Sequence, residues 1–325
     1  VGMAERALEL GLEYAKMREQ FGKPIASFQM MQSKLAEIYT EVETARAFSY
    51  RALAACVGLP KGAGGRGEIH KLTAAACLYA GEAFNKAVTE ACHIHETMNK
   101  QLRNDINLPT HFMTDEQQAL ADQAGKFFFS EFHHLNAEMD DTDDLPPSVF
   151  PKLGEMGYLG LNVPPEFGGA GLDFTSACII TEQLSRASAA IGLTHVAHDN
   201  LCVNNIYRNA NDDLRRKYLP GLCNGTLVGA LGLTEPGAGS DALGSMRTTA
   251  KKDGGNYILN GTKIYITNGP IADLVLVYAK TSPEKGAKGI SAFIVETDTP
   301  GFKVAQKLNK MGFRGSPTGE LVFED

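Results

Sequence analysis

One segment combines small, turn-forming and hydroxyl-bearing residues in a pattern that suits ligand binding. Residues 231–241 read Leu-Gly-Leu-Thr-Glu-Pro-Gly-Ala-Gly-Ser-Asp. Glycine adopts backbone angles that are closed to other residues and lets a ligand approach the main chain closely. We therefore predict a short buried strand over residues 228–233 that opens into a loop of exposed amides, with the hydroxyls of Thr234 and Ser240 at its edges. Such a loop suits a flat polar ring with a phosphate-bearing tail, but a strand followed by an ordinary glycine turn has the same composition.

A second segment follows closely along the chain. Residues 257–269 read Tyr-Ile-Leu-Asn-Gly-Thr-Lys-Ile-Tyr-Ile-Thr-Asn-Gly. Asn-Gly is the strongest short signal for a β-hairpin, because both turn residues accept positive φ angles. We therefore predict two strands that are joined at Asn260 and Gly261.

Together the two segments resemble the flavin-binding β-domain of the acyl-CoA dehydrogenase family. The family pattern is a loop similar to Thr-Glu-Pro-Gly-Ala-Gly-Ser-Asp, followed in the next hairpin by a strand end that reads aromatic-Ile-Thr-Asn. The family usually has Trp where this chain has Tyr265, which keeps an aromatic side chain at the position. The resemblance implies FAD as cofactor, with main-chain and hydroxyl contacts to the isoalloxazine from Leu231, Leu233 and Thr234, with Thr267 near N5, with Tyr265 and Ile266 beside the ring, and with Ser240 bonded to the CoA arm.

A third segment carries the resemblance to the other end of the chain. Residues 18–29 read Arg-Glu-Gln-Phe-Gly-Lys-Pro-Ile-Ala-Ser-Phe-Gln, as in the C-terminal helical domain of the family. In the family this loop reaches the FAD of a neighbouring subunit, which implies that Arg18 and Gln29 contact the pyrophosphate and adenosine side. A guanidinium fork suits a phosphate better than an ammonium does. The resemblance thus predicts a homodimer or homotetramer, whereas Arg18 without the motif is equally well explained as a solvated helix end.

The composition of the chain limits the classes of protein to which it can belong. The chain has 325 residues, of which 43% are hydrophobic and 21% charged, values typical of globular proteins with two or three domains. A net charge of −7 argues against a general nucleic-acid binder, and no apolar run reaches membrane-spanning length.

His93 and His95 lack a further ligand at a suitable spacing, so we predict no metal site. The six cysteines form no CxxC pair and are predicted to be reduced core thiols of an intracellular protein, in the bacterial cytoplasm or the mitochondrial matrix.

The remaining pattern predicts the elements that position these segments. Apolar residues recur at helical spacing over residues 1–57 and again over 68–92, with a glycine-rich linker at 58–67 between them. A further helix begins at Thr114, where Gln117 completes a capping box. Short strands between Gly and Pro turns predict an antiparallel β-domain near the C-terminus, with strands at 273–279, 289–295 and 319–323.

The fold class predicted from these elements is α+β, similar to the acyl-CoA dehydrogenases, with two helical domains flanking an antiparallel β-domain. Residues 153–160 and 164–171 match the run found in the family's N-terminal helical domain. We predict four parts: a helical bundle that corresponds to the family's C-terminal domain (1–96), a junction (97–113), a helical domain that corresponds to the N-terminal one (114–222) and a flavin-binding β-domain (223–325).

This order differs from that of the family, which runs helical domain, β-domain, helical bundle. The sequence is therefore expected to be circularly permuted or to be written in a permuted order. The segment that would join Asp325 to Val1 and the end of the bundle after Cys92 have no counterpart here, and the catalytic glutamate of the family falls in one or the other. No catalytic residue is assigned. Glu5 is a poor substitute, because roughly thirteen residues of helix would place it ~20 Å from the expected position.

Within the family, residues 195–202, 266–270 and 272–280 are most similar to the isovaleryl-CoA dehydrogenase branch. We interpret His195 and His198 in the first of these segments as core histidines rather than ligands. The resemblance implies α,β-dehydrogenation of a short or branched-chain acyl-CoA thioester, with electrons passed to an electron-transferring flavoprotein.

Two alternatives stay open. One is a non-catalytic flavin- or CoA-binding protein of the same fold, which the unassigned glutamate favours for this chain. The other is an acyl-CoA oxidase, which would use oxygen as the electron acceptor.

Overall fold

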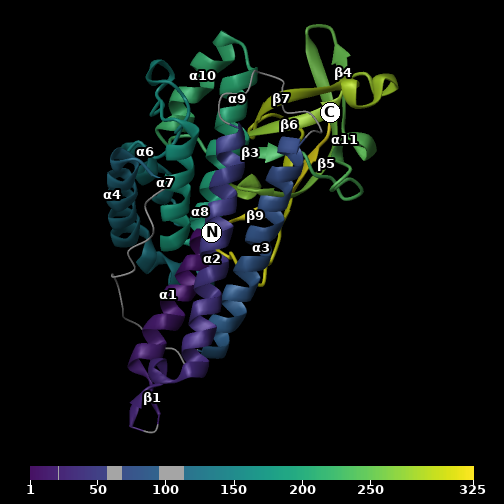
Figure 1. Ribbon diagram of the computed structural model, residues 1–325. Coiled ribbons are helices and arrows are strands. Elements are labelled where there is room, and N and C mark those ends of the chain that lie inside the picture. Colours follow the sequence, from purple (N-terminus) through teal and green to yellow (C-terminus); the bar gives the residue numbers. More distant parts are fainter. Residues whose placement is uncertain (21, 57–67, 95–112) are drawn as a thin grey trace. The chain divides into compact units, whose positions relative to one another are not determined.

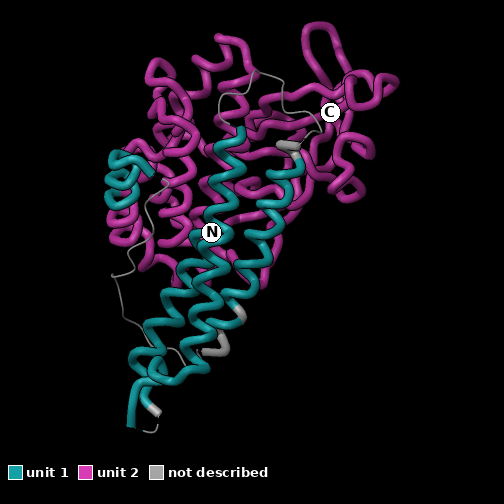
Figure 2. The backbone as a smooth tube through the Cα atoms, viewed as in Figure 1, with its two compact units in different colours: residues 1–123 teal, residues 124–325 magenta. Residues whose placement is uncertain are grey.

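The computed structural model describes residues 1–20, 22–56, 68–94 and 113–325 (Figure 1). They form two compact units, residues 1–123 and residues 124–325, which Figure 2 colours separately. Each unit is described by itself. The whole predicted linker at 58–67 lies outside the described residues, as do residues 97–112 of the predicted junction, His95 and the side chain of His93.

Unit 1 consists mainly of three long helices that pack along one another, as the apolar spacing predicted. Their core is formed largely by small and aliphatic side chains, among them Ala4, Leu8, Ile38 and Ala87. Between the first two helices the chain forms a short hairpin and a turn of 3-10 helix. The bounds are α1 (Gly2–Met17), β1 (Glu19–Gln20), β2 (Lys23–Pro24), η1 (Ile25–Ser27), α2 (Gln29–Cys56) and α3 (Glu68–Ile94).

Helix α4 (Asp115–Phe132) begins with the predicted capping box. Gln117 N–H donates to Thr114 Oγ1, and Thr114 N–H donates to Gln117 Oε1, each at 3.2 Å. The helices that follow in unit 2 are η2 (His133–Leu135), α5 (Asn136–Thr142), α6 (Val149–Glu155), η3 (Pro165–Phe167), α7 (Phe174–Ala187), α8 (Ala189–Val196), η4 (Ala197–Val203, a π-helix), α9 (Asn204–Asn209) and α10 (Asp212–Cys223).

A seven-stranded sheet completes unit 2, in the order β3-β6-β4-β5-β9-β8 with β7 paired to β6. The strands are β3 (Gly229–Gly232), β4 (Thr249–Asp253), β5 (Asn256–Thr267), β6 (Leu274–Lys280), β7 (Ile290–Glu296), β8 (Phe302–Lys307) and β9 (Thr318–Phe323), with the short helices α11 (Ala242–Ser245), η5 (Gly269–Ile271) and η6 (Pro283–Gly289) between them. The α+β class is confirmed, and the strands predicted at 228–233, 273–279, 289–295 and 319–323 are present as β3, β6, β7 and β9. The sheet is mixed rather than purely antiparallel, because β6 runs parallel to β3 and, at one position, to β4. The β4–β5 hairpin lies between β3 and β6 in the sequence and provides the long connection that a parallel pair needs.

The predicted hairpin at Asn260 and Gly261 is wrong. Both residues lie inside β5, which runs without a break from Asn256 to Thr267. The turn is instead made by Gly254 and Gly255, and Gly254 has a φ of 57°. Glycine is needed at position 261 for a different reason: a Cβ atom there would lie 2.4 Å from Thr248 Oγ1.

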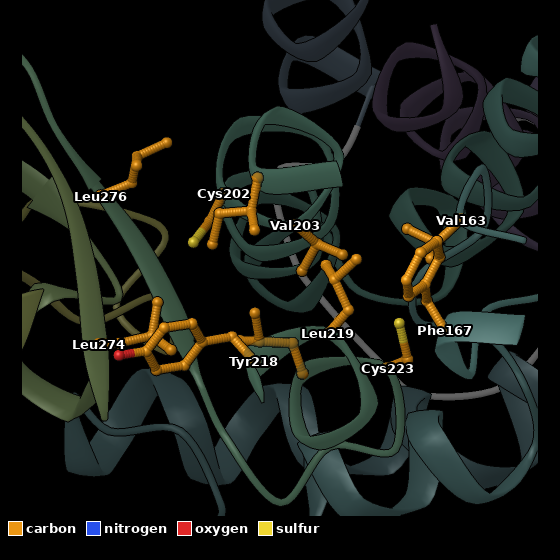
Figure 3. Close-up of a cluster of buried hydrophobic side chains, with 11 residues drawn as sticks. Val163, Phe167, Cys202, Val203, Tyr218, Leu219, Cys223, Leu274 and Leu276 are labelled. Carbon is orange, nitrogen blue, oxygen red and sulfur yellow. The ribbon is translucent and has the colours of Figure 1, made fainter. Parts of the chain in front are cut away.

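The helices of unit 2 share a core with the sheet (Figure 3). Leu274 and Leu276 of β6 face side chains from the helical side, including Cys202, Val203 and Leu219. The helices η4 and α10 therefore pack on β6, the strand that pairs with β3 at the end of the sheet.

The prediction of core thiols is correct for some of the described cysteines and wrong for others. Cys202 and Cys223 are buried, and burial raises the pKa of each thiol to about 12. Cys77, in α3, is exposed. Among the described residues, no helix has both the length and the apolar character that crossing a membrane would require.

Candidate functional site

Strand β3 has one edge that no strand covers, since it ends the strand order and pairs only with β6 among the described strands. The Gly229 peptide groups turn away from β6: its N–H donates to His198 Nδ1 at 3.0 Å, and its carbonyl accepts from Asn268 Nδ2 at 3.3 Å. Successive residues of a strand alternate in direction, so the Leu231 N–H and C=O point to the same uncovered edge. Because side chains already bond the Gly229 groups, the Leu231 N–H and C=O are the main-chain donor and acceptor that β3 offers to a ligand along this edge.

The loop after β3 is anchored by a tight turn. Glu235 N–H donates to the Ala238 carbonyl at 3.1 Å, and Ala238 N–H donates back to the Glu235 carbonyl at 3.0 Å. A Cβ atom built at Gly237 or Gly239 would meet nothing within 4 Å. The loop thus has the open main chain that the sequence predicted, and Ser240 lies exposed at its far end.

A hydrogen bond between main-chain groups joins this loop to β5. Ile264 N–H donates to the Thr234 carbonyl at 2.9 Å. The two segments that carry chemistry in the sequence are therefore adjacent in the structure. Among the described residues, neither the Thr234 hydroxyl nor the Thr267 hydroxyl has a protein hydrogen-bond partner, and both threonines are half-buried.

Strand β5 bulges where it passes the loop. Its pairing with β9 shifts register between Lys263 and Ile266, and Tyr265 inside the bulge has a φ of 61°. A left-handed backbone is uncommon for a bulky residue and marks local strain. Tyr265 is 66% exposed, whereas the Ile266 side chain is buried in the core of the sheet. Ile266 therefore offers a ligand its main chain rather than its side chain.

Sequence reasoning missed a buried ion pair beside these segments. Lys263 Nζ lies 2.8 Å from Glu235 Oε1, and the side chains are 0% and 4% exposed. Burial lowers the pKa of Lys263, while the bond to Glu235 opposes that change. Burial acts to raise the pKa of Glu235, but bonds from Lys263, Thr248 and Arg247 hold it below its usual value. The sequence around Lys263 gave no local signal of the pair, because a lysine in a strand usually faces solvent.

The two histidines of the helical side are core residues, as predicted. His195 Nε2 lies 2.8 Å from the Tyr158 carbonyl, and His198 Nε2 lies 3.0 Å from the Leu222 carbonyl. Both rings are buried. The part of the chain that the structure describes contains no group of three or more His, Cys, Asp or Glu side chains that could hold a metal ion.

The remaining predicted contacts lie in unit 1. Arg18 caps the C-terminus of α1, where its N–H donates to the Tyr14 carbonyl at 2.8 Å, and both Arg18 and Gln29 are exposed. Glu5 is buried, and Arg46 Nη2 lies 2.8 Å from its Oε2 atom. The structure therefore uses Glu5 in the core of the bundle, in agreement with its rejection as a catalytic base.

Three domain models of one family match the chain. The C-terminal domain of acyl-CoA dehydrogenases matches residues 1–99, the N-terminal domain residues 114–226 and the middle domain residues 230–325. The order C-terminal, N-terminal, middle is the permuted order that the motifs predicted.

Curated relatives agree with this match. Mitochondrial isovaleryl-CoA dehydrogenase of Pongo abelii is 44% identical over 217 residues, which are 66% of this chain and 51% of that protein. An acyl-CoA dehydrogenase of Bacillus subtilis is 43% identical over 213 residues, 66% of this chain and 56% of that protein. The chain thus spans about half the length of the curated relatives it matches.

Solved structures are similar as well. Butyryl-CoA dehydrogenase of Megasphaera elsdenii has a TM-score of 0.62 and 38% identity, covering 68% of this chain and 57% of that one. Glutaryl-CoA dehydrogenase of Mycobacterium smegmatis in complex with FADH2 has a TM-score of 0.62 and 31% identity, covering 66% and 53%. With three domain models matched and relatives above 40% identity, the chain belongs to the acyl-CoA dehydrogenase family.

Proposed function

We propose that this chain acts as an FAD-dependent acyl-CoA dehydrogenase, which introduces an α,β double bond into a short or branched-chain acyl-CoA thioester. The observation that carries the proposal is the 2.9 Å bond between Ile264 N–H and the Thr234 carbonyl. It brings the two flavin-type segments together beside the uncovered edge of β3. The names of the similar proteins, which include isovaleryl-CoA and butyryl-CoA dehydrogenases, support this substrate class.

The residues present fit FAD. The Leu231 peptide groups at the uncovered edge offer main-chain donors and acceptors, and Thr234 and Thr267 offer hydroxyls without protein partners among the described residues. Open space around Gly237 and Gly239 lets a ligand approach the loop. A flat ring with polar edges needs this combination of main-chain and hydroxyl groups.

When bound, FAD supplies the acceptor for the hydride that leaves the β-carbon. The chain's own part is to hold and orient: main-chain groups of Leu231 and Leu233 and the hydroxyls of Thr234 and Thr267 fix the ring, and Tyr265 and Ile266 lie beside it. Ser240 bonds the CoA arm. Removal of the α-proton requires a carboxylate base, and hydrogen bonds to the thioester carbonyl make that proton more acidic. No residue is assigned as the base. Glu5, the one substitute considered, is held by Arg46 in the core of the bundle.

The proposal extends to partners and location. Electrons pass to an electron-transferring flavoprotein, and a structure described as the electron transferring flavoprotein of Acidaminococcus fermentans is among the similar ones, with 42% identity, a TM-score of 0.63 and coverage of 68% of this chain and 57% of that one. Arg18 and Gln29 contact the FAD of a second subunit, so the protein is a homodimer or homotetramer. Relatives are mitochondrial or bacterial, which supports the mitochondrial matrix or the bacterial cytoplasm.

An anaerobic absorbance experiment tests the function. The purified protein is reconstituted with FAD, and isovaleryl-CoA or butyryl-CoA is added while the flavin absorbance is followed. Bleaching is the expected result, and free CoA is the matched control because it has no acyl chain to oxidise. If flavin binds but does not bleach with any acyl-CoA, the protein is a non-catalytic flavin-binding protein. Rapid re-oxidation of the bleached flavin by oxygen would indicate an oxidase, and a protein that takes up no flavin would overturn the proposal altogether.

A further inference from the structure

The two segments of the proposed flavin site are fastened to each other by an ion pair that is sealed from solvent. Lys263 Nζ lies 2.8 Å from Glu235 Oε1, and the two side chains are 0% and 4% exposed. Glu235 belongs to the loop after β3, and Lys263 belongs to β5 just before its bulge. A buried pair adds little net stability over apolar side chains of similar volume, because desolvation offsets the attraction between the charges. The ion pair matters instead because Glu235 and Lys263 orient the main-chain groups to which they bond.

Glu235 fixes the loop to the segment that leads into β4. Its Oε1 atom accepts from Thr248 N–H at 3.0 Å, and its Oε2 atom accepts from Arg247 N–H at 2.6 Å. Together with Lys263, the carboxylate has three donors from two separate segments. The loop is therefore held at its first turn and cannot shift relative to β4 and β5 without breaking charge-assisted bonds.

Lys263 in turn bonds the main chain of the site. Its Nζ atom donates to the Leu233 carbonyl at 3.1 Å. The Leu233 C=O and the Thr234 N–H belong to the same peptide group, so a cation at the carbonyl oxygen polarises that peptide and strengthens the Thr234 N–H as a donor. Apolar side chains would fill the same space without this effect.

We propose that Glu235 and Lys263 are positioning residues of the flavin site, which orient and polarise the Leu233–Thr234 peptide and thereby raise both the affinity for FAD and its reduction potential. The inference rests on the proposed function, since it concerns the binding of FAD at this edge. Reduction makes the flavin richer in electrons, and a fixed, polarised N–H donor stabilises that state more than the oxidised one.

The test compares the full chain with the double variant Glu235→Gln/Lys263→Met, which removes both charges and keeps the approximate volumes. The matched control is Glu324→Gln/Lys303→Met, which makes the same chemical change at an exposed pair of the same sheet, 2.8 Å apart. Three quantities are measured: the denaturant midpoint, the Kd for FAD from titration of the apoprotein, and the midpoint potential of the bound flavin.

We expect the double variant to unfold near the wild-type midpoint, to bind FAD at least tenfold more weakly, equivalent to about 1.4 kcal/mol, and to have a more negative flavin potential. The control keeps the wild-type Kd and potential. If the double variant binds FAD with the wild-type Kd and potential, the positioning role is overturned while the proposed function stands. If the wild-type protein binds no FAD, both are overturned.

A second variant covers the case in which the double variant does not fold. Glu235→Asp keeps the charge but withdraws the carboxylate by one methylene, so it loosens the bond to Lys263 without leaving a buried charge alone. We expect Glu235→Asp to bind FAD at least threefold more weakly and to shift the flavin potential in the negative direction. Wild-type values for both would again overturn the inference.

Discussion

His198 ties the end of α10 to the first residue of β3. Its Nδ1 atom accepts from Gly229 N–H at 3.0 Å, and its Nε2 atom, 3.0 Å from the Leu222 carbonyl, is the donor to that oxygen. This arrangement needs the neutral ring with its proton on Nε2. Burial lowers the pKa of His198 to about 3, although the bond to Leu222 acts in the opposite direction. The uncovered edge of β3 is therefore aligned by a histidine that stays neutral in the folded state over most of the acid range.

We expect the free energy of unfolding to fall as the pH drops from about 6.5 to about 3, the interval between the ordinary and the folded pKa of His198. In this interval the unfolded chain binds a proton that the folded chain does not, which gives a slope of up to ~1.4 kcal/mol per pH unit. His198→Gln removes that contribution to the slope. It also lowers stability at neutral pH by about 1–3 kcal/mol, because the bond from Gly229 N–H is lost. Urea unfolding across this pH range measures both effects.

The control for this experiment is His134→Gln, which replaces an exposed histidine of the same unit and leaves the buried ring in place. It should keep the wild-type slope. A His198→Gln protein whose stability depends on pH as steeply as that of the wild type would contradict the assignment.

Gly261→Ala tests why a glycine occupies the middle of β5. The added Cβ atom would lie 2.4 Å from Thr248 Oγ1 and 2.8 Å from Thr248 Cα, so backbone has to move. We expect a loss of about 1–3 kcal/mol in the free energy of unfolding, as for other overpacked sites. Gly255→Ala is the control, since a Cβ atom there meets nothing within 4 Å, and it should change stability by no more than about 0.5 kcal/mol. Equal stability of the two variants in chemical denaturation would show that Gly261 is not needed for close packing.

Gly261 also illustrates which parts of the fold the sequence predicts. The strand before residue 234 and the capping box at Thr114 depend on neighbouring residues, so local patterns suffice for them. The Asn-Gly pair carries a strong local signal for a turn, but Gly261 instead packs closely against Thr248, the residue before β4. The parallel pairing of β6 with β3 likewise depends on residues far apart in the chain, which no local pattern encodes.

The site shows the same division. The segments that line it were recognisable as motifs, because loop glycines and hydroxyls leave a local signature. Lys263 was not, since a lysine in a strand usually faces solvent and its acidic partner lies 28 positions away. The proximity of Thr234 and Ile264 follows from the motif resemblance, but the bond between them, the bulge at Tyr265 and the buried pair beside them are tertiary features.

Glu5→Gln tests whether the only glutamate weighed as a substitute base has a structural role. The substitution removes one of the two carboxylates that bond the buried Arg46 guanidinium, which keeps its ion pair with Glu43, so we expect a loss of about 1.5–3 kcal/mol in the free energy of unfolding. We expect amide hydrogen exchange in α1 and α2 to accelerate accordingly, while the rate of flavin bleaching per folded molecule stays at the wild-type value. Glu37→Gln, at an exposed position of α2, should change neither quantity. Loss of bleaching with unchanged exchange in Glu5→Gln would instead identify Glu5 as the base.

Thr267→Val separates ligand binding from folding at the proposed flavin site. The Thr267 hydroxyl has no protein partner among the described residues, so its replacement by a methyl group should change the free energy of unfolding by no more than about 0.5 kcal/mol. The proposed bond near flavin N5 is lost, which should weaken FAD binding by about 0.5–1.5 kcal/mol, or roughly two- to tenfold in Kd. A shift of the flavin absorption maximum should accompany the weaker binding. Thr262→Val on the same strand, whose hydroxyl also lacks a partner among these residues, should leave Kd and spectrum as they are. If the two variants bind FAD equally well and with the same spectrum, Thr267 does not contact the ring, and the flavin lies elsewhere along the edge of β3.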